Sequence, residues 1–276
     1  MGVNAAVAFR VAPVRFGIAI LPEYQWSQGR GLWTQAEEYG FHHAWTYDHL
    51  SWRTLADGPW FSAIPTLTAD ALATTTLRIG TLVASPNYRH PVPFAKELVT
   101  VDEISGGRLN LGLGAGGIGF DATVLGADVL APKQRADRFT EFVELLDQLL
   151  VADHTAYAGR YFEAVDARTV PMPFQEPRIP FVIAANGPRM MRLALRYGSG
   201  WVTTGTSDPA DGLAAWWTNV ERLAVRFTEL ERDHQRASAI ERYLHVDASG
   251  VPALSSIEYF RECVGRAAEA GFTDLI

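Results

Sequence analysis

The chain has 276 residues, of which 48% are hydrophobic, and its formal net charge is −7. This length and apolar content allow a large buried core, arranged as one α/β barrel or as two smaller domains. The acidic balance and the lack of a basic cluster in the sequence argue against nucleic acid or an anionic membrane as a partner. The single cysteine, Cys263, excludes an internal disulfide and a cysteine-rich metal site, so a reducing, cytoplasmic location is expected.

Residues 1–13 read MGVNAAVAFRVAP and lack the long apolar core of a secretory signal. We expect a flexible leader there and a single domain over residues 14–276. No run in the sequence approaches the roughly 20 consecutive apolar residues of a membrane-spanning helix, so no membrane partner is expected.

Short apolar runs rich in branched residues alternate along the chain with stretches of helical periodicity. We expect strands over residues 14–20, 43–48, 77–84, 109–113, 180–184, 201–204, 243–248 and 273–276. We expect helices over residues 28–39, 59–74, 93–104, 132–151, 189–197, 209–236 and 255–270. The side chains predicted to face the core from the first, second and fourth helices are Leu32, Ala36, Tyr39, Ile64, Leu67, Ala71, Leu72, Phe139, Val143, Leu146 and Leu150.

Eight buried strands that alternate with helices favour an α/β fold of the (β/α)8 TIM-barrel type. An open, doubly wound sheet is the alternative, since it needs no closure. The printed sequence ends as the eighth strand forms, so the eighth helix is expected to be missing or trimmed. Residues 152–178 contain Gly159, Pro171, Pro173 and Pro177, which predicts an insertion or long loop after the fourth helix rather than a regular element.

Active sites of such barrels lie at the carboxyl ends of the strands. Two of these ends are of a kind that exposes backbone amides, namely 114–117 (GAGG) and 185–189 (ANGPR). Glycine lets the backbone approach a ligand closely, and a helix start turns free amides toward an anion. Ordinary turns use the same residues, so each stretch taken alone is a weak indication of a cofactor site.

Asp48 and His49 form the most specific pair at these strand ends. A histidine can accept or donate a proton near neutral pH, and a neighbouring carboxylate can remain ionised. The alternative is that His49 caps a turn or lies in the core. His42, His43 and His49 could also suggest a metal site, but strand alternation separates them and no acidic residue stands at ligand spacing, so no metal is expected.

Several stretches resemble the bacterial luciferase-like superfamily of flavin and deazaflavin oxidoreductases. They are 78–83 (RIGTLV), 89–91 (RHP), 98–113 (LVTVDEISGGRLNLGL) and the exit 114–117. The pair at 48–49, the 185–188 turn and 197–203 (YGSGWVT) are closer to the branch that uses the deazaflavin coenzyme F420. The resemblance covers nearly all of residues 14–276.

This resemblance implies a barrel that holds the ring of F420, or of FMN in related enzymes, across the carboxyl ends of the strands. It also implies a non-proline cis peptide at Leu82–Val83 or the next bond, with Val83 behind the ring and Ser85 at its edge. The implied cofactor-binding residues are Asp48, Val83, Ser85, Gly114, Ala115, Gly116, Ala185, Asn186, Gly187, Pro188 and Arg189. The implied catalytic residues are His49 and Asp48, and the implied substrate contacts are His49, Trp52 and Asp121.

One position departs from the pattern of the glucose-6-phosphate dehydrogenases in this branch. In those enzymes a glutamate follows the glycine-rich exit and donates a proton, whereas Gly117 stands here. The departure argues against a sugar-phosphate substrate and leaves Asp121 as the nearest carboxylate that could substitute. Trp52, Trp60 and Phe120 near the strand ends suggest an aromatic-lined pocket, or equally the packing of loops on the barrel.

The function expected from the resemblance is an F420-dependent oxidoreductase that transfers a hydride between deazaflavin C5 and a small organic substrate, with His49 moving the proton. One alternative is an FMN-dependent monooxygenase that uses reduced flavin and oxygen. Another is a barrel that binds a cofactor without turnover. A homodimer is expected by analogy.

Overall fold

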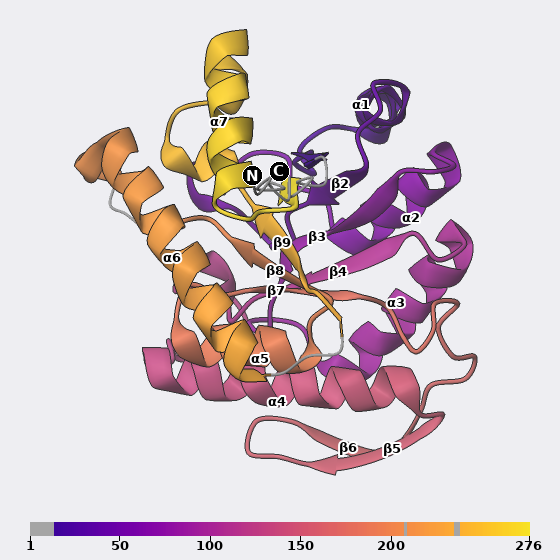
Figure 1. The fold of residues 1–276 in the computed structure, drawn as a ribbon. Helices are drawn as coiled ribbons and strands as arrows, with labels where there is room; N and C mark the ends of the chain where they lie inside the picture. Colours follow the sequence, from indigo (N-terminus) through magenta and orange to yellow (C-terminus); the bar gives the residue numbers. More distant parts are fainter. Residues whose placement is uncertain (1–13, 207–208, 235–237) are drawn as a thin grey trace, which may run out of the picture.

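The computed structural model describes residues 14–206, 209–234 and 238–276, which form a closed barrel of eight parallel strands (Figure 1). Around the barrel the order is β1-β10-β9-β8-β7-β4-β3-β2. The strands are β1 (Arg15–Ala19), β2 (His43–Thr46), β3 (Arg78–Ala84), β4 (Leu109–Leu113), β7 (Phe181–Ala184), β8 (Gly200–Thr203), β9 (Glu241–Leu244) and β10 (Asp274–Leu275). The predicted barrel is confirmed and the open-sheet alternative is wrong. The expected leader, residues 1–13, lies outside the described residues.

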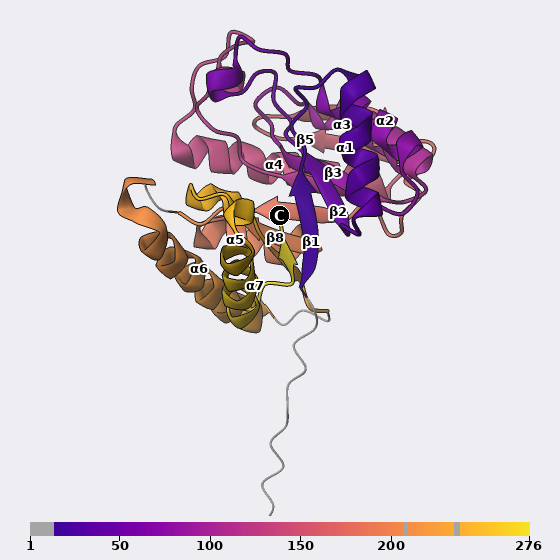
Figure 2. The same ribbon diagram turned by 90° about the horizontal axis from the view of Figure 1, so that it is seen from above.

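Seven α-helices of the described chain lie outside the strands, with α1 to α3 on one side and α5 to α7 on another (Figure 2). They are α1 (Trp26–Glu38), α2 (Ala63–Ala73), α3 (Pro91–Ser105), α4 (Pro132–Val151), α5 (Pro188–Tyr197), α6 (Gly212–His234) and α7 (Ile257–Glu269). Among the described residues, no helix has the length and apolar character needed to cross a membrane.

The predicted core face of α4 is confirmed, but those of α1 and α2 are partly wrong. Phe139, Val143, Leu146 and Leu150 are all fully buried. On α1, Leu32 is exposed, and Tyr39, the residue directly after the helix, is 76% exposed, because the inner face is formed by Gly29, Trp33 and Ala36. On α2, Leu72 is 76% exposed for the same geometric reason, since Leu67, Asp70 and Ala71 form the inner face. Neighbouring helix positions differ by about 100°, so an error of one residue changes which side chain is buried.

Residues 152–178 contain a regular element that the sequence analysis did not expect. β5 (His154–Ala158) and β6 (Glu163–Arg168) form an antiparallel hairpin that runs along the outer side of α4 (Figure 1). The amides of Arg160 and Tyr161 in its turn donate to the carboxylate of Glu141 on α4, over 3.1 and 2.8 Å. Gly159 opens this turn, so the glycine that was interpreted as a loop signal is a hairpin signal.

Large rings fill the barrel interior, and glycines on neighbouring strands make room for them. Trp45 and Tyr243 meet edge to face with ring centroids 5.7 Å apart. A Cβ atom on Gly80 would lie 2.8 Å from the Trp45 ring, and one on Gly200 would lie 2.8 Å from the Tyr243 ring. These separations are too short for a real side chain, so the interior requires glycine at both positions.

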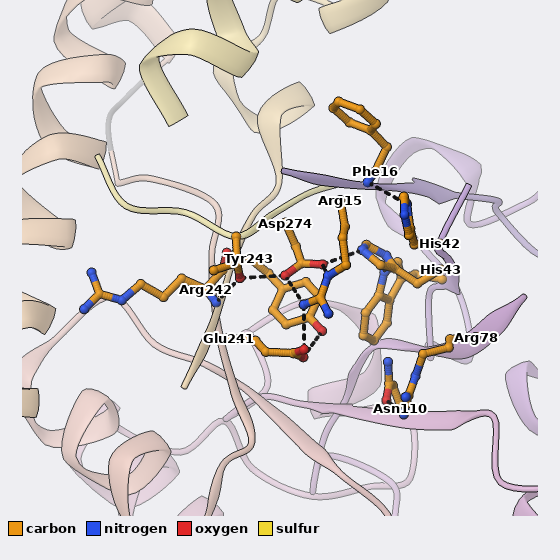
Figure 3. Close-up of polar contacts among 12 residues, drawn as sticks. Arg15, Phe16, His42, His43, Arg78, Asn110, Glu241, Arg242, Tyr243 and Asp274 are labelled. Atoms are coloured by element: carbon orange, nitrogen blue, oxygen red, sulfur yellow. Dashed lines mark hydrogen bonds and ion pairs between the residues drawn. The ribbon is translucent and has the colours of Figure 1, made fainter. Parts of the chain in front are cut away.

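A polar network closes the amino end of the barrel (Figure 3). Arg15, at the start of β1, donates through Nε and Nη2 to the two carboxylate oxygens of Asp274 on β10, over 2.8 and 2.7 Å. The Nη2 group also contacts Glu241 of β9 at 2.5 Å, and the Tyr243 hydroxyl donates to the same carboxylate at 2.6 Å. The first strand is thereby joined to the last two.

His43 extends this network into the barrel interior. The indole N–H of Trp45 donates to Nδ1 of His43 over 2.6 Å, so the proton of the neutral ring is on Nε2, which faces Asp274 at 3.1 Å. Burial lowers the pKa of His43 and outweighs the opposing effect of Asp274. His43 is therefore a neutral structural residue at the end of the barrel opposite His49.

Asp70 on α2 is a buried carboxyl group to which the structure gives no hydrogen-bond partner. Burial raises its pKa to about 9, from an ordinary value of 3.8. The folded protein therefore holds the proton over a pH range in which the unfolded chain has lost it. Uptake of this proton adds to the free energy of unfolding. The addition is fully present below the pKa that Asp70 has in the unfolded chain, and it is lost as the pH rises toward the pKa that Asp70 has in the folded protein.

We expect Asp70→Asn to stabilise the protein at about pH 8 by on the order of a few kcal/mol, and to change little near pH 4, because the amide cannot ionise. Urea denaturation of both proteins across this range measures the difference. The matched control is Asp57→Asn, at an exposed aspartate, which should show no such pH-dependent gain. A constant offset between Asp70→Asn and wild type at all pH values would contradict the assignment.

Candidate active site

His49 follows β2 at the carboxyl end of the barrel, and a carboxylate from a distant loop holds its ring. Nδ1 of His49 is hydrogen-bonded to Asp121, which lies in the short 3-10 helix η2 (Phe120–Ala122). The amide of Leu50 donates to the other oxygen of Asp121 over 2.8 Å. An ionised carboxylate only accepts hydrogen bonds, so Nδ1 carries the ring proton and Nε2 presents a lone pair. This arrangement can accept a proton from a substrate.

His49 belongs to a connected set of four rings, and we call Tyr47, His49, Trp52 and His245 the ring cluster. The His49 and Trp52 centroids are 4.3 Å apart with an interplanar angle of 33°, and Tyr47 meets Trp52 edge-on at 5.3 Å. Tyr47 also lies 6.4 Å from His49 and 6.4 Å from His245. Burial raises the pKa of Tyr47 and lowers that of His245, so both rings are held in their neutral forms.

Asp48 lies beside His49 in sequence but belongs to a different set of contacts. Its buried carboxylate accepts from Nε and Nη2 of Arg89, over 3.1 and 2.7 Å, and from the hydroxyl of Tyr88 over 2.5 Å. Burial and the charge of Asp48 raise the pKa of Tyr88. Burial lowers the pKa of Arg89, but its hydrogen bonds to Asp48 outweigh this and the pKa is raised. The carboxylate therefore joins the end of β2 to the loop after β3.

The Leu82–Val83 peptide bond is cis, as the resemblance implied. The side chain of Val83 lies over the exit of β4, where a Cβ atom on Gly114 would be 2.5 Å from Val83 Cγ2. Ser85 is buried, and its hydroxyl accepts from the amide of Asn87 over 3.4 Å. Glycine at 114 is thus required for the backbone of β4 to pass beneath Val83.

Asn87 joins the glycine-rich exit to α4. Its Nδ2 donates to the carbonyl of Gly117 over 3.2 Å, and its Oδ1 accepts from Nη2 of Arg138 over 2.5 Å. Gly116 has a φ of +76°, and a Cβ atom there would lie 2.5 Å from the same Oδ1. The exit therefore has both a left-handed backbone and a close side-chain neighbour that only glycine accommodates.

The turn between β7 and α5 has the features of an anion site. Ala185 is buried and its carbonyl accepts from the Trp201 indole over 2.8 Å, while Asn186 accepts from the Thr203 hydroxyl over 2.5 Å. No side chain caps the N-terminus of α5 at Gly187, and a Cβ atom placed there would meet no atom within 4 Å. The first amides of α5 are therefore open to a phosphate, and these residues fit the tail of a nucleotide-like cofactor.

Arg189, the second residue of α5, is paired with Asp137 of α4 over 2.7 Å, and both side chains are partly exposed.

The described residues contain no group of three or more His, Cys, Asp or Glu side chains that could hold a metal ion.

Four residues of this region were missed by the sequence analysis as site residues. Arg89 and Tyr88 had a signal, because Arg89 stands in the RHP motif and a buried arginine needs a carboxylate partner. His245 was placed inside a strand at 243–248, whereas β9 ends at Leu244 and a 3-10 helix follows from Val246. Asn87 had no signal beyond its position in a turn.

A model of the luciferase-like monooxygenase family matches residues 10–249. The F420-dependent glucose-6-phosphate dehydrogenase of Amycolatopsis mediterranei (strain U-32) is 29% identical over 272 residues, covering 91% of this chain and 78% of the relative. The 4-hydroxyprotoasukamycin monooxygenase of Streptomyces nodosus subsp. asukaensis is 32% identical over 261 residues, covering 88% of this chain and 67% of that protein.

Among solved structures, an F420-dependent secondary alcohol dehydrogenase in complex with an F420-acetone adduct superposes with a TM-score of 0.80. The match covers 96% of this chain and 92% of that one at 19% identity, so it bears on the fold alone. Since the family model spans most of the sequence, the chain belongs to the luciferase-like monooxygenase family.

Proposed function

We propose that the protein is an F420-dependent oxidoreductase that moves a hydride between the cofactor and a small organic substrate. The observation that carries the proposal is the His49–Asp121 pair beside the strand that bears Val83. The relative from Amycolatopsis, named as F420-dependent, supports the choice of cofactor. Bound F420 supplies a hydride acceptor or donor, which no amino-acid side chain supplies.

The residues that would hold the cofactor lie on three loops of the same rim. Val83 would support the ring from behind, and Ser85 and the exit formed by Gly114, Ala115 and Gly116 would contact its edge and tail. The turn of Ala185, Asn186, Gly187 and Pro188, with the open amides of α5 and the side chain of Arg189, would bind the phosphate.

His49 would move the proton that accompanies the hydride. With Nδ1 held by Asp121, Nε2 accepts the hydroxyl proton of an alcohol in one direction and returns it to a carbonyl oxygen in the other. Asp121 is therefore proposed as a positioning residue that fixes the tautomer and the orientation of the His49 ring. Trp52, against the His49 ring, would contact the substrate.

Asp48 has a different proposed role from the catalytic and cofactor-binding roles implied by the resemblance. Both of its oxygens are already bonded to Arg89 and Tyr88. We propose that it contributes to the cofactor site by holding the loop after β3 in place, rather than as a proton-transfer group.

An FMN-dependent monooxygenase is the second candidate, because a relative from Streptomyces is named as a monooxygenase and covers most of this chain.

We also propose a homodimer, since Tyr39 and Leu72 are large apolar side chains exposed at the end of α1 and on α2, where a second copy could cover them. A cytoplasmic location agrees with the single, unpaired and buried Cys263.

Titration of the purified protein with F420 and with FMN, followed by fluorescence, tests the choice of cofactor. We expect saturable binding of F420 at least about tenfold tighter than that of FMN, equivalent to about 1.4 kcal/mol. Preferential binding of FMN would favour the monooxygenase. Binding of F420 without turnover on any alcohol or ketone would favour the non-catalytic barrel.

His49→Ala should keep the affinity for F420 within about twofold and lower kcat by about 10²–10⁴-fold, the usual range for a lost general acid or base. Stopped-flow reduction of bound F420 measures the catalytic loss. His154→Ala, on the exposed hairpin, is the control and should behave as wild type. If His49→Ala binds no cofactor, then His49 is a structural residue.

Asp121→Asn should lower kcat/KM by about 10²–10⁴-fold, because an amide no longer holds the proton on Nδ1. The loss should fall on kcat, while KM and the affinity for F420 change less than about twofold, because the carboxylate orients the His49 ring and contacts neither ligand in this proposal. Asp128→Asn lies in the same loop at an exposed aspartate and should leave kcat and KM unchanged. A matching loss of F420 affinity, together with a lower melting temperature, would indicate only a structural role for Asp121.

A further inference from the structure

The loop between β4 and α4 exposes an unusual number of large apolar side chains. Ile118 is 67% exposed and Phe120 is 50% exposed, and Val124, Leu125 and Val129 of the same loop are also exposed. Across from them, Leu50 after β2 is 43% exposed. Single exposed apolar side chains are ordinary, but a group of them gathered on adjoining loops indicates a surface that binds something apolar.

This apolar group is continuous with the proposed proton-transfer site. Asp121 follows Phe120 directly, and it binds both the ring of His49 and the amide of Leu50. Leu50 and Phe120 are therefore tied by the backbone to the residues whose hydrogen bonds orient His49. This adjacency to the His49–Asp121 pair favours a substrate as the occupant of the apolar surface over a second protein or a membrane.

The two buried aspartates at this rim are already paired. Asp48 is bonded to Arg89, and Asp121 to His49. Arg53 stacks on Trp52, with Cζ 4.4 Å from the ring centroid, and is otherwise in water. The inner wall is the ring cluster, whose Tyr47 and His245 are held neutral by burial. The rim thus has apolar area to contribute to binding, and its exposed charges near the ring cluster are one of each sign, Arg53 and Asp247.

We propose, resting on the proposed function, that the substrate is an uncharged and mainly apolar alcohol or carbonyl compound. Its oxygen lies at Nε2 of His49, and its hydrocarbon part lies against Trp52, Leu50 and Phe120. The affinity comes from the apolar area removed from water, so it increases with the length of the hydrocarbon part.

The first test measures reduction of F420 by the F420-loaded protein with propan-2-ol, butan-2-ol, pentan-2-ol and hexan-2-ol, and with glucose 6-phosphate and glycerol 3-phosphate. We expect kcat/KM to increase about threefold to fourfold for each added methylene group, and no turnover of the two phosphate esters. A flat series, or preferential use of a phosphate ester, would overturn the substrate class. Failure to bind F420 at all is a separate result, seen in the titration, and would remove the proposed function and this inference together.

The second test locates the apolar contacts. Phe120→Asn and Leu50→Asn should each lower kcat/KM for hexan-2-ol by about tenfold, while the value for propan-2-ol and the F420 affinity change less than about twofold. Both side chains are partly exposed, so the variants should fold. Val165→Asn, at an 81% exposed valine on the hairpin, is the matched control. An equal loss for both alcohols would show that the loops only position His49, and no loss would place the hydrocarbon part elsewhere.

Discussion

The barrel is closed between its first and last strands by an ion pair as much as by backbone hydrogen bonds. β10 has only two residues, which leaves little ladder for β1 to pair with. Arg15 and Asp274 are register partners across this seam, and their two parallel hydrogen bonds give a fixed geometry that a single contact would not. His43 and Glu241 extend the contact to the strands on either side. The ring cluster stands on loops at the opposite ends of these strands, so its geometry depends on this closure.

At the carboxyl rim, Asp48 and Asp121 are also paired, but with different consequences. The contact of Asp48 with Arg89 is buried, and its main effect is to fix the loop after β3 relative to the end of β2. The contact of Asp121 with His49 leaves one ring nitrogen available. Asp48 and His49 are neighbours in the sequence, yet Asp48 holds the scaffold whereas His49 keeps a ring nitrogen that can exchange a proton. The Asp48 side chain is fully buried and the His49 side chain is partly exposed, which accounts for this difference.

Much of the fold could be predicted from the sequence, because each strand and helix has a local pattern. The bounds of β4 and α4 agree with the prediction, and α4 has an unbroken apolar stripe. The errors occurred where the pattern was ambiguous by one residue, as at Leu72, or where a turn glycine belonged to a hairpin, as at Gly159. The non-proline cis bond could be predicted only from the resemblance, since no local pattern in the residues near Val83 indicates it.

The site was less predictable, because its contacts join residues that are far apart in the chain. His49 could be found from its position after a strand, but its contact with Asp121 is made by a loop 72 residues later. The course of a long loop is set by tertiary contacts and not by its own periodicity. The same limit applies to His245, whose position relative to Tyr47 depends on where β9 ends and on the closure of the barrel.

The side-chain carboxamide of Asn87 makes two hydrogen bonds, one to the carbonyl of Gly117 and one to Arg138 on α4. Helix α4 packs outside the strands and also supports the turn of the hairpin through Glu141. A shift of α4 along its axis would pull on Asn87 and so on the glycine-rich exit. Sequence changes in the hairpin, on the outermost layer of the molecule, therefore have a mechanical route to the glycine-rich exit that passes through the Asn87 carboxamide.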